Sequence, residues 1–367
     1  MVTAPAAEPG LRLACLGISH RTATSDLRER SGFPALQLRD ALSAARHDPR
    51  IERLVIVATC HRTELYAETP HNAPDTAETL LEWWSANCSI PVSALAPHAY
   101  ALTGVDAARH LFRVTAGLDS VVLGEAQIIG QVATSLRQSV AVHAASPLLK
   151  LAFKCAVRAG ERARALVWGR LQAASLGSAA VDAAVAAAHG LRGRNVIVVG
   201  AGEIAELALR SLSAHAPRKV TIANRTMETA QEMGLRHGAD ACALDQLPYA
   251  MRDADVVIAA TRATRAFIDQ ATVAAALEHR AGRPLTLIDV SLPRNVDVAV
   301  RQVVGANLVG IDDLGAYITA GHAERRAMVP AVERLVDSEL AMLRMRLARR
   351  NSVAPRPGAD MTATAAA

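Results

Sequence analysis

The chain has 367 residues, of which 51% are hydrophobic and 3% aromatic. Because domains average roughly 150 residues, this length predicts two or three domains with a large core built mainly from Ala, Val and Leu. The formal net charge of +5 fits an acidic partner such as RNA, but it equally fits a protein that binds no nucleic acid. The five cysteines form no C-x-x-C pair and no zinc-type spacing with histidine, which is typical of a reduced cytosolic compartment.

The N-terminus predicts neither a signal peptide nor a membrane anchor. It begins MVTAPAAEPGLRLACLG, without a basic segment followed by a long apolar one. Elsewhere, no apolar run approaches the roughly 18 residues needed to cross a bilayer. We therefore expect a cytoplasmic protein with no membrane partner.

The first hundred residues predict an α+β unit, in which two apolar, β-branched segments flank a segment with helical spacing. The two strand-like segments and the helical one are residues 12–19, 51–60 and 33–48. From Asp106 onward the pattern is helical, with breaks at Gly117 and Gly124 and a turn at Ser146-Pro147. We expect these helices to pack on the first unit.

The middle of the chain predicts a doubly wound parallel sheet. An Ala-rich helix ends at Gly190, and a strand, a glycine-rich turn and a helix follow directly. Further strands, separated by helical stretches, are expected at 219–225, 254–261 and 285–290. This alternation indicates a parallel sheet from about residue 191 to residue 309.

The C-terminal part predicts one amphipathic helix and a low-complexity tail. Residues 323–350 carry an apolar stripe that packs either on the chain's own domains or on a second copy. Its members are Val332, Val336, Leu340, Leu343 and Leu347. Pro330 lacks a backbone N–H, so we expect it to kink the helix. The tail from Ser352 has too little apolar content to fold.

The segment VIVVGAGEIAELA fits the G-x-G-x-x-A variant of the dinucleotide-binding fingerprint. Gly200 allows the turn, Gly202 lets the backbone approach a pyrophosphate, and the small Ala205 lets helix meet strand. The alternative is a purely structural glycine turn, but the strand before the glycines and the helix after them favour the cofactor site. The predicted cofactor loop consists of Gly200, Ala201, Gly202, Glu203, Ile204 and Ala205.

The end of the next strand predicts NADPH as the cofactor. NAD enzymes usually keep a carboxylate about twenty residues after the glycines, but this chain has Asn224, Arg225 and Thr226 there. A cation and a hydroxyl suit a 2′-phosphate. The alternative is a solvent-facing arginine at a strand end.

The stretch LVIVATCHRTELY places a thiol, Cys60, where an apolar strand ends. Taken alone, Cys60 would more often be a small core residue than a nucleophile. Its position beside Arg62 predicts a stabilised thiolate, with a pKa below the usual value of roughly 8.5. Neighbours on a strand point to opposite faces, so Cys60 and His61 would not chelate one ion and we expect no metal site. A thiol and an NADP domain in one chain suggest that an activated acyl group is captured as a thioester and then reduced to an aldehyde.

Six segments resemble the glutamyl-tRNA reductase family, NADPH-dependent enzymes that start tetrapyrrole synthesis. In chain order they are LGISHRTATSDLRER, ATCHRTELY, RHLFRVTAGLDSVVLGEAQIIGQV, GAGEIAELA, IANRT and DVSLPRNVD. The resemblance implies an α/β protein with an N-terminal α+β catalytic domain, a Rossmann-type doubly wound NADP-binding domain and a long C-terminal helix. The expected divisions are 1–10 (disordered), 11–165 (catalytic, binding glutamyl-tRNA), 166–310 (NADP-binding), 311–350 (a helix remaining from the dimerisation domain) and 351–367 (disordered tail).

The resemblance also implies a reaction and a set of site residues. A thiolate at Cys60 attacks the ester between glutamate and tRNA, and hydride from NADPH then yields glutamate-1-semialdehyde, the first step of the C5 route to 5-aminolevulinate. Arg62 is the implied partner of the substrate carboxylate, and His110 is implied to assist proton transfer or orient the ester. The implied substrate-binding residues are Thr59, His61, Arg62, Ser120, Glu125, Ala126, Gln127 and Gln131.

The chain departs from the family pattern at several positions. His61 stands where relatives usually have Asn, Ala126 where they have Pro, and Ala165–Val167 where they have a Thr-Glu-Thr run. Two alternatives therefore stay open: a paralogue that reduces a related activated acyl substrate, and a catalytically weak regulator that binds tRNA or tetrapyrrole. The implied partners are glutamyl-tRNA(Glu), the downstream glutamate-1-semialdehyde aminotransferase and, given the short C-terminal region, a weak homodimer.

Overall fold

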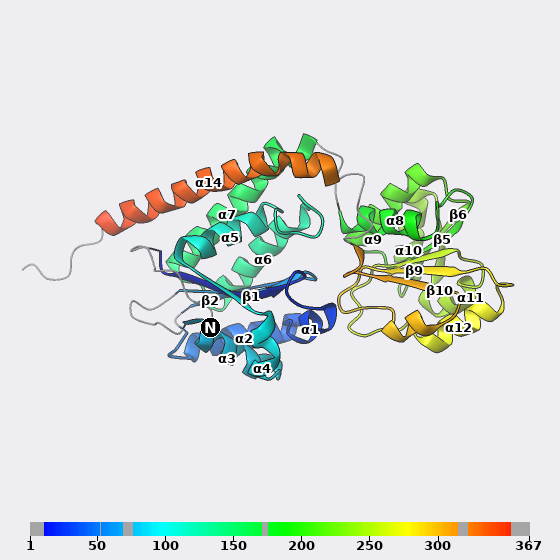
Figure 1. Cartoon of the computed structure of the whole chain (residues 1–367), viewed down its shortest axis with the longest axis horizontal. Helices are drawn as coiled ribbons and strands as arrows, with labels where there is room; N and C mark the ends of the chain where they lie inside the picture. Colours follow the sequence, from blue (N-terminus) through cyan, green and yellow to red (C-terminus); the bar gives the residue numbers. More distant parts are fainter. Residues whose placement is uncertain (1–10, 52, 69–75, 171–174, 315–321, 354–367) are drawn as a thin grey trace, which may run out of the picture.

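The computed structural model describes residues 11–51, 53–68, 76–170, 175–314 and 322–353 (Figure 1). The two predicted disordered ends, apart from residues 351–353, lie outside these ranges. The described residues form two units around separate sheets, and a long C-terminal helix lies over the first unit (Figure 1). Within the described ranges, no helix is both long and apolar enough to span a bilayer.

The first unit is an antiparallel sheet of order β2-β3-β1-β4 with helices on both faces (Figure 1). The strands are β1 (Leu13–Ser19), β2 (Leu54–Ala58), β3 (Arg62–Glu68) and β4 (Tyr100–Thr103). One face carries α1 (Ser25–Arg30), α2 (Ala35–His47), α3 (Thr76–Cys88) and α4 (Val92–Leu95), and the other carries α5 (Gly104–Thr115), α6 (Gln127–Ala141) and α7 (Pro147–Leu166). Because side chains alternate along a strand, Leu16 and Ile18 enter one core while Leu13 and Cys15 enter the other. The two predicted strands and the helix between them are confirmed.

The sequence analysis does not predict β3, which pairs with both β1 and β2. Its sequence, RTELYAE, is largely polar although every residue of the strand is buried. Thr59, Cys60 and His61 therefore form the turn of a β2–β3 hairpin, in which the Thr59 N–H donates to the Arg62 carbonyl at 2.8 Å. The expectation that Cys60 and His61 sit on opposite faces of a strand is wrong, because the strand ends at Ala58.

Two glycines close the loop between α5 and α6. Gly117 and Gly124 have φ values of 75° and 76°, and a Cβ on Gly117 would lie 2.8 Å from the Cα of Gly124. The ring of Trp168 covers Gly124, and its Nε1 donates to the Ala116 carbonyl at 2.8 Å. The predicted helix breaks at both glycines are confirmed, and the tight loop fixes where α6 begins.

The second unit is a parallel sheet of order β10-β9-β8-β5-β6-β7. The strands are β5 (Asn195–Val199), β6 (Lys219–Asn224), β7 (Asp240–Ala243), β8 (Val256–Ala259), β9 (Leu285–Asp289) and β10 (Ala306–Gly310). The flanking helices are α8 (Leu176–Ala187), α9 (Glu203–Leu212), α10 (Met227–His237), α11 (Leu247–Ala250) and α12 (Gln270–Glu278). Counted from β5, this is the 3-2-1-4-5-6 order of the Rossmann fold, in which ligands bind where the order reverses, between β5 and β8. The predicted doubly wound sheet is confirmed, and the short edge strand β7 is an addition to it.

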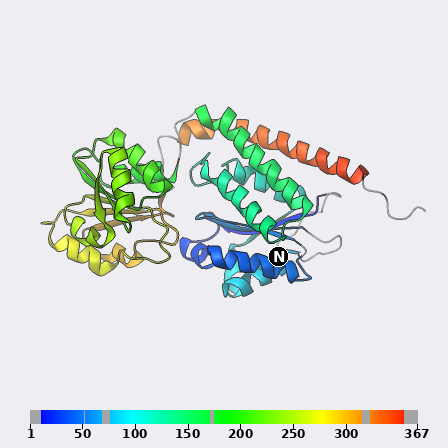
Figure 2. The ribbon, with the colours of Figure 1, turned by 180° about the vertical axis from the view of Figure 1, so that it is seen from behind.

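Helix α14 (His322–Val353) continues through Pro330, which lies inside the helix and does not end it. The helix runs alongside α5 and α7 of the first unit (Figures 1 and 2). Its stripe is buried in the core that those helices share, which stabilises the helix despite the backbone hydrogen bond that a proline removes. The buried members are Val332, Val336, Leu340 and Leu343, with Leu347 packed at the edge. Of the two expected alternatives, the stripe packs on its own chain.

Glu339 provides a test of how firmly α14 is held. Its buried carboxylate accepts hydrogen bonds from Arg158, at 2.7 Å, and from Arg162, both on α7. We expect Glu339→Ala to lower the free energy of unfolding by about 1.5–3 kcal/mol, the usual contribution of hydrogen bonds to a charged group. Asp337→Ala is the matched control, because its pair with Arg109 is half-exposed and should contribute less than about 1 kcal/mol. Urea unfolding at pH 7 measures both, and equal losses would contradict a special role for Glu339.

Candidate active site

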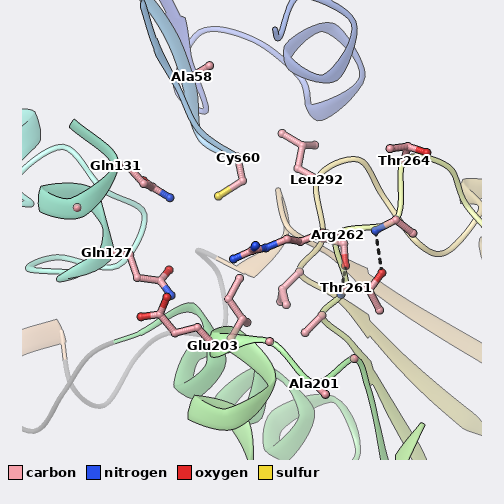
Figure 3. Close-up of a pocket in the computed structure, with 18 of the residues that line it drawn as sticks. Ala58, Cys60, Gln127, Gln131, Ala201, Glu203, Thr261, Arg262, Thr264 and Leu292 are labelled. Atoms are coloured by element: carbon pink, nitrogen blue, oxygen red, sulfur yellow. Dashed lines mark hydrogen bonds between the residues drawn. The ribbon is translucent and has the colours of Figure 1, made fainter. Parts of the chain in front are cut away.

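A cleft of about 1360 Å³ lies between the two units (Figure 3). The first unit contributes the β2–β3 turn and one face of α6, and the second contributes the turn after β5 and the loops after β6, β8 and β9. Of the predicted site residues, those that line the cleft are Cys60, Ala126, Gln127, Gln131, Gly200, Ala201, Gly202, Glu203, Ile204, Asn224 and Arg225. Two predicted sites from separate sheets, the thiol and the cofactor loop, therefore open into one space.

The turn between β5 and α9 has the geometry of a dinucleotide site. Gly200 has a φ of 110°, and a Cβ there would lie 2.5 Å from the Ala260 carbonyl oxygen, so the position requires glycine. Gly202 precedes the first turn of α9 and faces open space, which leaves room for a phosphate at the helix N-terminus. Ala205 is fully buried where α9 meets the sheet. All three small residues therefore fit a bound dinucleotide, the cofactor that the fingerprint implies.

The end of β6 places a cation on the same cleft. Asn224 and Arg225 line it, and the Asn224 side-chain amide donates to the Thr226 carbonyl at 3.0 Å. Thr226, the residue before α10, is not among the described residues that line the cleft. Arg225 is exposed, with no hydrogen bond or ion pair to any residue in the described ranges. Its charge is therefore available to an anionic ligand.

Cys60 is partly exposed on the cleft, but its surroundings do not lower the pKa of its thiol as the sequence analysis expects. Burial, and then the charge of Glu125, raise the pKa of Cys60 to about 12, while Arg28 and Arg62 lower it less. The Nε of Arg28 donates to the Cys60 carbonyl at 3.3 Å rather than to the sulfur. The thiol pKa differs from the expected one mainly because the effect of burial outweighs that of the two arginines.

Arg62 does not reach the cleft in the described residues. Its guanidinium is buried, donating to Glu64 at 2.7 Å, to the Asp119 carboxylate at 3.0 Å and to the Asp119 carbonyl. Glu64 and Asp119 thus pair with the guanidinium that the sequence analysis expects to bind the substrate carboxylate. In the described residues Arg62 is the centre of a buried network next to the hairpin turn.

His110 belongs to the same buried network. Its Nε2 lies 2.8 Å from an oxygen of Glu64, which also accepts from Tyr100 at 2.5 Å. Cys15, Glu64 and His110 bring ligand-type atoms within 4.8 Å of one another. Because the Glu64 oxygens already accept from Arg62, Tyr66, Tyr100 and His110, this cluster is a hydrogen-bonded network rather than a metal centre. His110 is not among the described residues that line the cleft.

The other predicted substrate-binding residues do not line the cleft; they are Thr59, His61, Ser120 and Glu125. Thr59 holds the turn, its hydroxyl accepting from the His61 N–H at 3.2 Å. The His61 ring is buried, and burial lowers its pKa to about 3, so the ring is neutral. Ser120 and Glu125 are buried in the α5–α6 loop. Burial also raises the pKa of Glu125 to about 7, so this carboxyl changes charge near neutral pH.

Glu125 and Cys60 give a pH-dependent prediction. The carboxylate of Glu125 raises the thiol pKa, so Glu125→Gln should move the pH profile of Cys60 alkylation by iodoacetamide toward lower pH. An ordinary thiol has a pKa of roughly 8.5. In the unmodified protein the alkylation rate should keep rising above that pH, because the Cys60 pKa is near 12. Peptide mass spectrometry measures the rate at Cys60 alone. A plateau near pH 8.5, or an unshifted profile in Glu125→Gln, would contradict this account.

The sequence analysis misses a group of arginines and threonines, with one glutamine, that also line the cleft. They are Thr134, Arg137 and Gln138 on α6 and Thr261, Arg262, Thr264 and Arg265 after β8. The signal was present, since TRATR directly follows a parallel strand and the carboxyl ends of such strands carry the ligand site.

Charged side chains close the two units onto each other beside the cleft. Asp312, just beyond β10, accepts from Arg28 at 2.8 Å and from the Ser25 N–H at 3.0 Å. Arg294 lies 3.6 Å from Glu29 of α1. These contacts bring the cofactor loop and the cysteine turn to the same space.

Comparison with known proteins finds a matching family for each of the two units. The family described as glutamyl-tRNAGlu reductase, N-terminal domain, matches residues 16–166, and the shikimate / quinate 5-dehydrogenase family matches residues 182–317. The chain is 35% identical over 328 residues to the glutamyl-tRNA reductase of Desulforudis audaxviator (strain MP104C), covering 89% of this chain and 73% of that one. It is also similar to the solved structure of glutamyl-tRNA reductase from Methanopyrus kandleri, with a TM-score of 0.51 and 31% identity over 92% of this chain and 81% of that one.

The Rossmann order, the glycine loop and the dehydrogenase match define an oxidoreductase with a unit for a nicotinamide cofactor. The identity to relatives over most of the chain specifies the family. The chain belongs to the glutamyl-tRNA reductase family.

Proposed function

We propose that the protein reduces glutamyl-tRNA to glutamate-1-semialdehyde with NADPH, through a thioester on Cys60. The observation that carries this proposal is that Cys60 and the cofactor loop line one cleft, although they belong to separate sheets. A thioester carbonyl is more electrophilic than an ester or amide, which explains why a thiol would face a hydride-donor site.

The chain's own residues account for the first half of the reaction. The Cys60 thiol loses its proton, its sulfur bonds to the ester carbonyl carbon, and the tRNA 3′-terminal oxygen leaves with a proton. Gln127 and Gln131, one turn apart on α6, lie on the cleft beside Cys60 and offer amide donors to the substrate (Figure 3). The residues from Gly200 to Ile204 would hold NADPH, with Arg225 near its 2′-phosphate, and the bound cofactor would supply the hydride that reduces the thioester to an aldehyde.

A single-turnover experiment tests the proposal. Purified protein is mixed with glutamyl-tRNA labelled in the glutamate, without and with NADPH. Without the cofactor, label should be found on the Cys60 peptide, and hydroxylamine should release it; with the cofactor, the label should be trapped as the semialdehyde. Free glutamate in place of a labelled Cys60 peptide, with no aldehyde on adding NADPH, would overturn the proposal.

Cofactor choice is a separate prediction. Arg225 has no partner among the described residues, so Arg225→Ala should reduce the preference for NADPH over NADH by about 1.5–3 kcal/mol in kcat/KM, the range for a hydrogen bond to a charged group. Arg218→Ala is the control, because that exposed arginine bonds Asn195 on the same unit. Equal kcat/KM for the two cofactors in the unmodified protein would contradict the assignment of Arg225.

A further inference from the structure

Helix α6 presents one of its sides to the cleft, and this side continues well past the two glutamines beside Cys60 (Figure 3). The other side of the helix is buried in the core of the first unit, where Ile128 and Val132 hold it in place. At a rise of about 1.5 Å per residue, the Cα of Arg137 lies about 15 Å beyond that of Gln127. The α6 surface consists of the residues, recurring every three or four positions, that this side contributes to the cleft: Gln127, Gly130, Gln131, Thr134, Arg137 and Gln138.

Gly130 leaves a gap in the α6 surface. A Cβ at this position would meet no atom within 4 Å, and Gly130 is not one of the glycines with a positive φ. Neither packing nor backbone conformation therefore requires glycine, although a glycine inside a helix is destabilising relative to alanine. The bare backbone leaves open space in the cleft, one turn of the helix beyond Gln127.

Arg137 is directed along the α6 surface by the helix itself. The Thr134 hydroxyl donates to the Gly130 carbonyl at 2.8 Å, and Nη2 of Arg137 donates to the same hydroxyl at 2.7 Å. These two bonds draw the guanidinium back along the helix toward the gap at Gly130. Arg137 is exposed and forms no ion pair with a carboxylate in the described ranges. Among the described residues that line the cleft, the acidic one is Glu203 of the other unit, so the charge of Arg137 is available to an anionic ligand.

We propose that the α6 surface binds the single-stranded 3′ end of the tRNA, with Gly130 leaving room for the terminal nucleoside and Arg137 binding a phosphate on its 5′ side. This inference rests on the proposed function and adds the part of the site that holds the nucleotides. The ester that reacts at Cys60 is attached to the terminal ribose, so the nucleotides must extend away from the thiol along a wall of the cleft. The wall formed by α6 belongs to the same unit as Cys60, whereas the dinucleotide loop belongs to the other unit. The RNA end and the cofactor therefore occupy different walls.

Apolar side chains of the same unit also line the cleft and suit a nucleobase. They are Phe33, Leu38 and Ala58. Phe33 is fixed by stacking on Trp83, with 6.1 Å between the ring centroids, and α2, which carries Leu38, contacts α6. A base has flat faces that pack on aromatic and apolar groups whatever its identity, and single-stranded RNA is commonly bound by such a surface together with a basic group on the backbone.

The first test measures binding of uncharged tRNA, so it needs no reaction at Cys60. Arg137→Ala should weaken binding of the intact tRNA roughly three- to tenfold at low salt, and the slope of log K against log salt should become shallower by about 0.7, the value for one phosphate of a single strand. A tRNA shortened by its single-stranded 3′ nucleotides should bind both proteins equally. Arg39→Ala is the matched control, because this exposed arginine of α2 is not among the described residues that line the cleft. Unchanged binding in Arg137→Ala, an equal loss in Arg39→Ala, or the same loss with the shortened tRNA would overturn the proposal.

The second test fills the gap at Gly130. Gly130→Leu should leave the protein folded, because no atom lies within 4 Å of a Cβ there, and should lower kcat/KM for glutamyl-tRNA roughly tenfold or more, mainly through KM. Alkylation of Cys60 by iodoacetamide, a small molecule without a nucleotide, should be unchanged in the same variant. An unchanged KM for glutamyl-tRNA, or an equal slowing of alkylation, would overturn the role of the gap. If the unmodified protein does not reduce glutamyl-tRNA, the proposed function fails, and binding of intact against shortened tRNA still decides whether the α6 surface holds an RNA end.

Discussion

Cys60→Ser is expected to abolish reduction of glutamyl-tRNA, with a loss of roughly 10³-fold or more in kcat, while the protein stays folded. A serine hydroxyl is almost wholly protonated at neutral pH, and the hydrogen-bonded His110 lies in a separate network with Glu64. Burial raises the pKa of the Cys60 thiol to about 12, but a thiol remains more acidic than an aliphatic hydroxyl, and the thiolate formed when it loses its proton is the stronger nucleophile. Serine lacks that advantage.

The measurement is single-turnover formation of semialdehyde, with Cys242→Ser as the matched control. Cys242 is a partly exposed thiol on the edge strand β7 and does not line the cleft. Its replacement should therefore leave turnover unchanged. Circular dichroism of both variants checks that they fold. Turnover in Cys60→Ser within a few-fold of the unmodified protein would rule out the thioester route.

Features set by short stretches of sequence could be predicted, and those set by pairing of distant segments could not. The cofactor turn follows from local residues: Gly200 needs a positive φ, and the strand before it and the helix after it are visible in the hydrophobic pattern. The break between α5 and α6 likewise follows from Gly117 and Gly124.

The partners of Arg62 depend instead on how distant segments of the chain pack together. Asp119, 57 positions away, arrives through the α5–α6 loop, and Glu64 shares its face of β3 because side chains alternate along a strand. The sequence therefore places a charged residue beside Cys60 but does not show that Glu64 and Asp119 already pair with it. The same limit hid the residues after β8, which line the same cleft as Cys60 because the two units meet there.

Gly17 on β1 shows how the fold makes room for this network. Gly17 pairs with Glu64, and a Cβ there would lie 2.7 Å from the Cγ of Glu64 and 3.1 Å from the Tyr100 ring. The missing side chain gives Glu64 the space in which its oxygens accept from Arg62 and Tyr66, both at 2.7 Å.

Glu64→Gln is expected to lower the free energy of unfolding at pH 7 by about 3–5 kcal/mol, the usual cost of breaking a buried ion pair. The amide keeps the volume of the side chain but leaves the buried Arg62 with Asp119 as its remaining carboxylate partner. Glu82→Gln is the control, because its pair with Arg50 is exposed and should contribute less than about 1 kcal/mol.

The pH dependence of unfolding separates lost charge from altered packing in Glu64→Gln. Burial alone would raise the pKa of Glu64, but the charge of Arg62 and hydrogen bonds from His110 and Tyr100 outweigh it and hold the pKa well below its usual value of 4.5. A carboxyl with a depressed pKa contributes stability above its unfolded pKa and loses it as the pH falls toward its folded pKa. The difference between Glu64→Gln and the unmodified protein should therefore be full at pH 7 and shrink progressively below pH 4.5. Urea unfolding between pH 7 and pH 3 measures this difference, and a gap that stays constant across that range would show that packing, and not the charge of Glu64, stabilises the network.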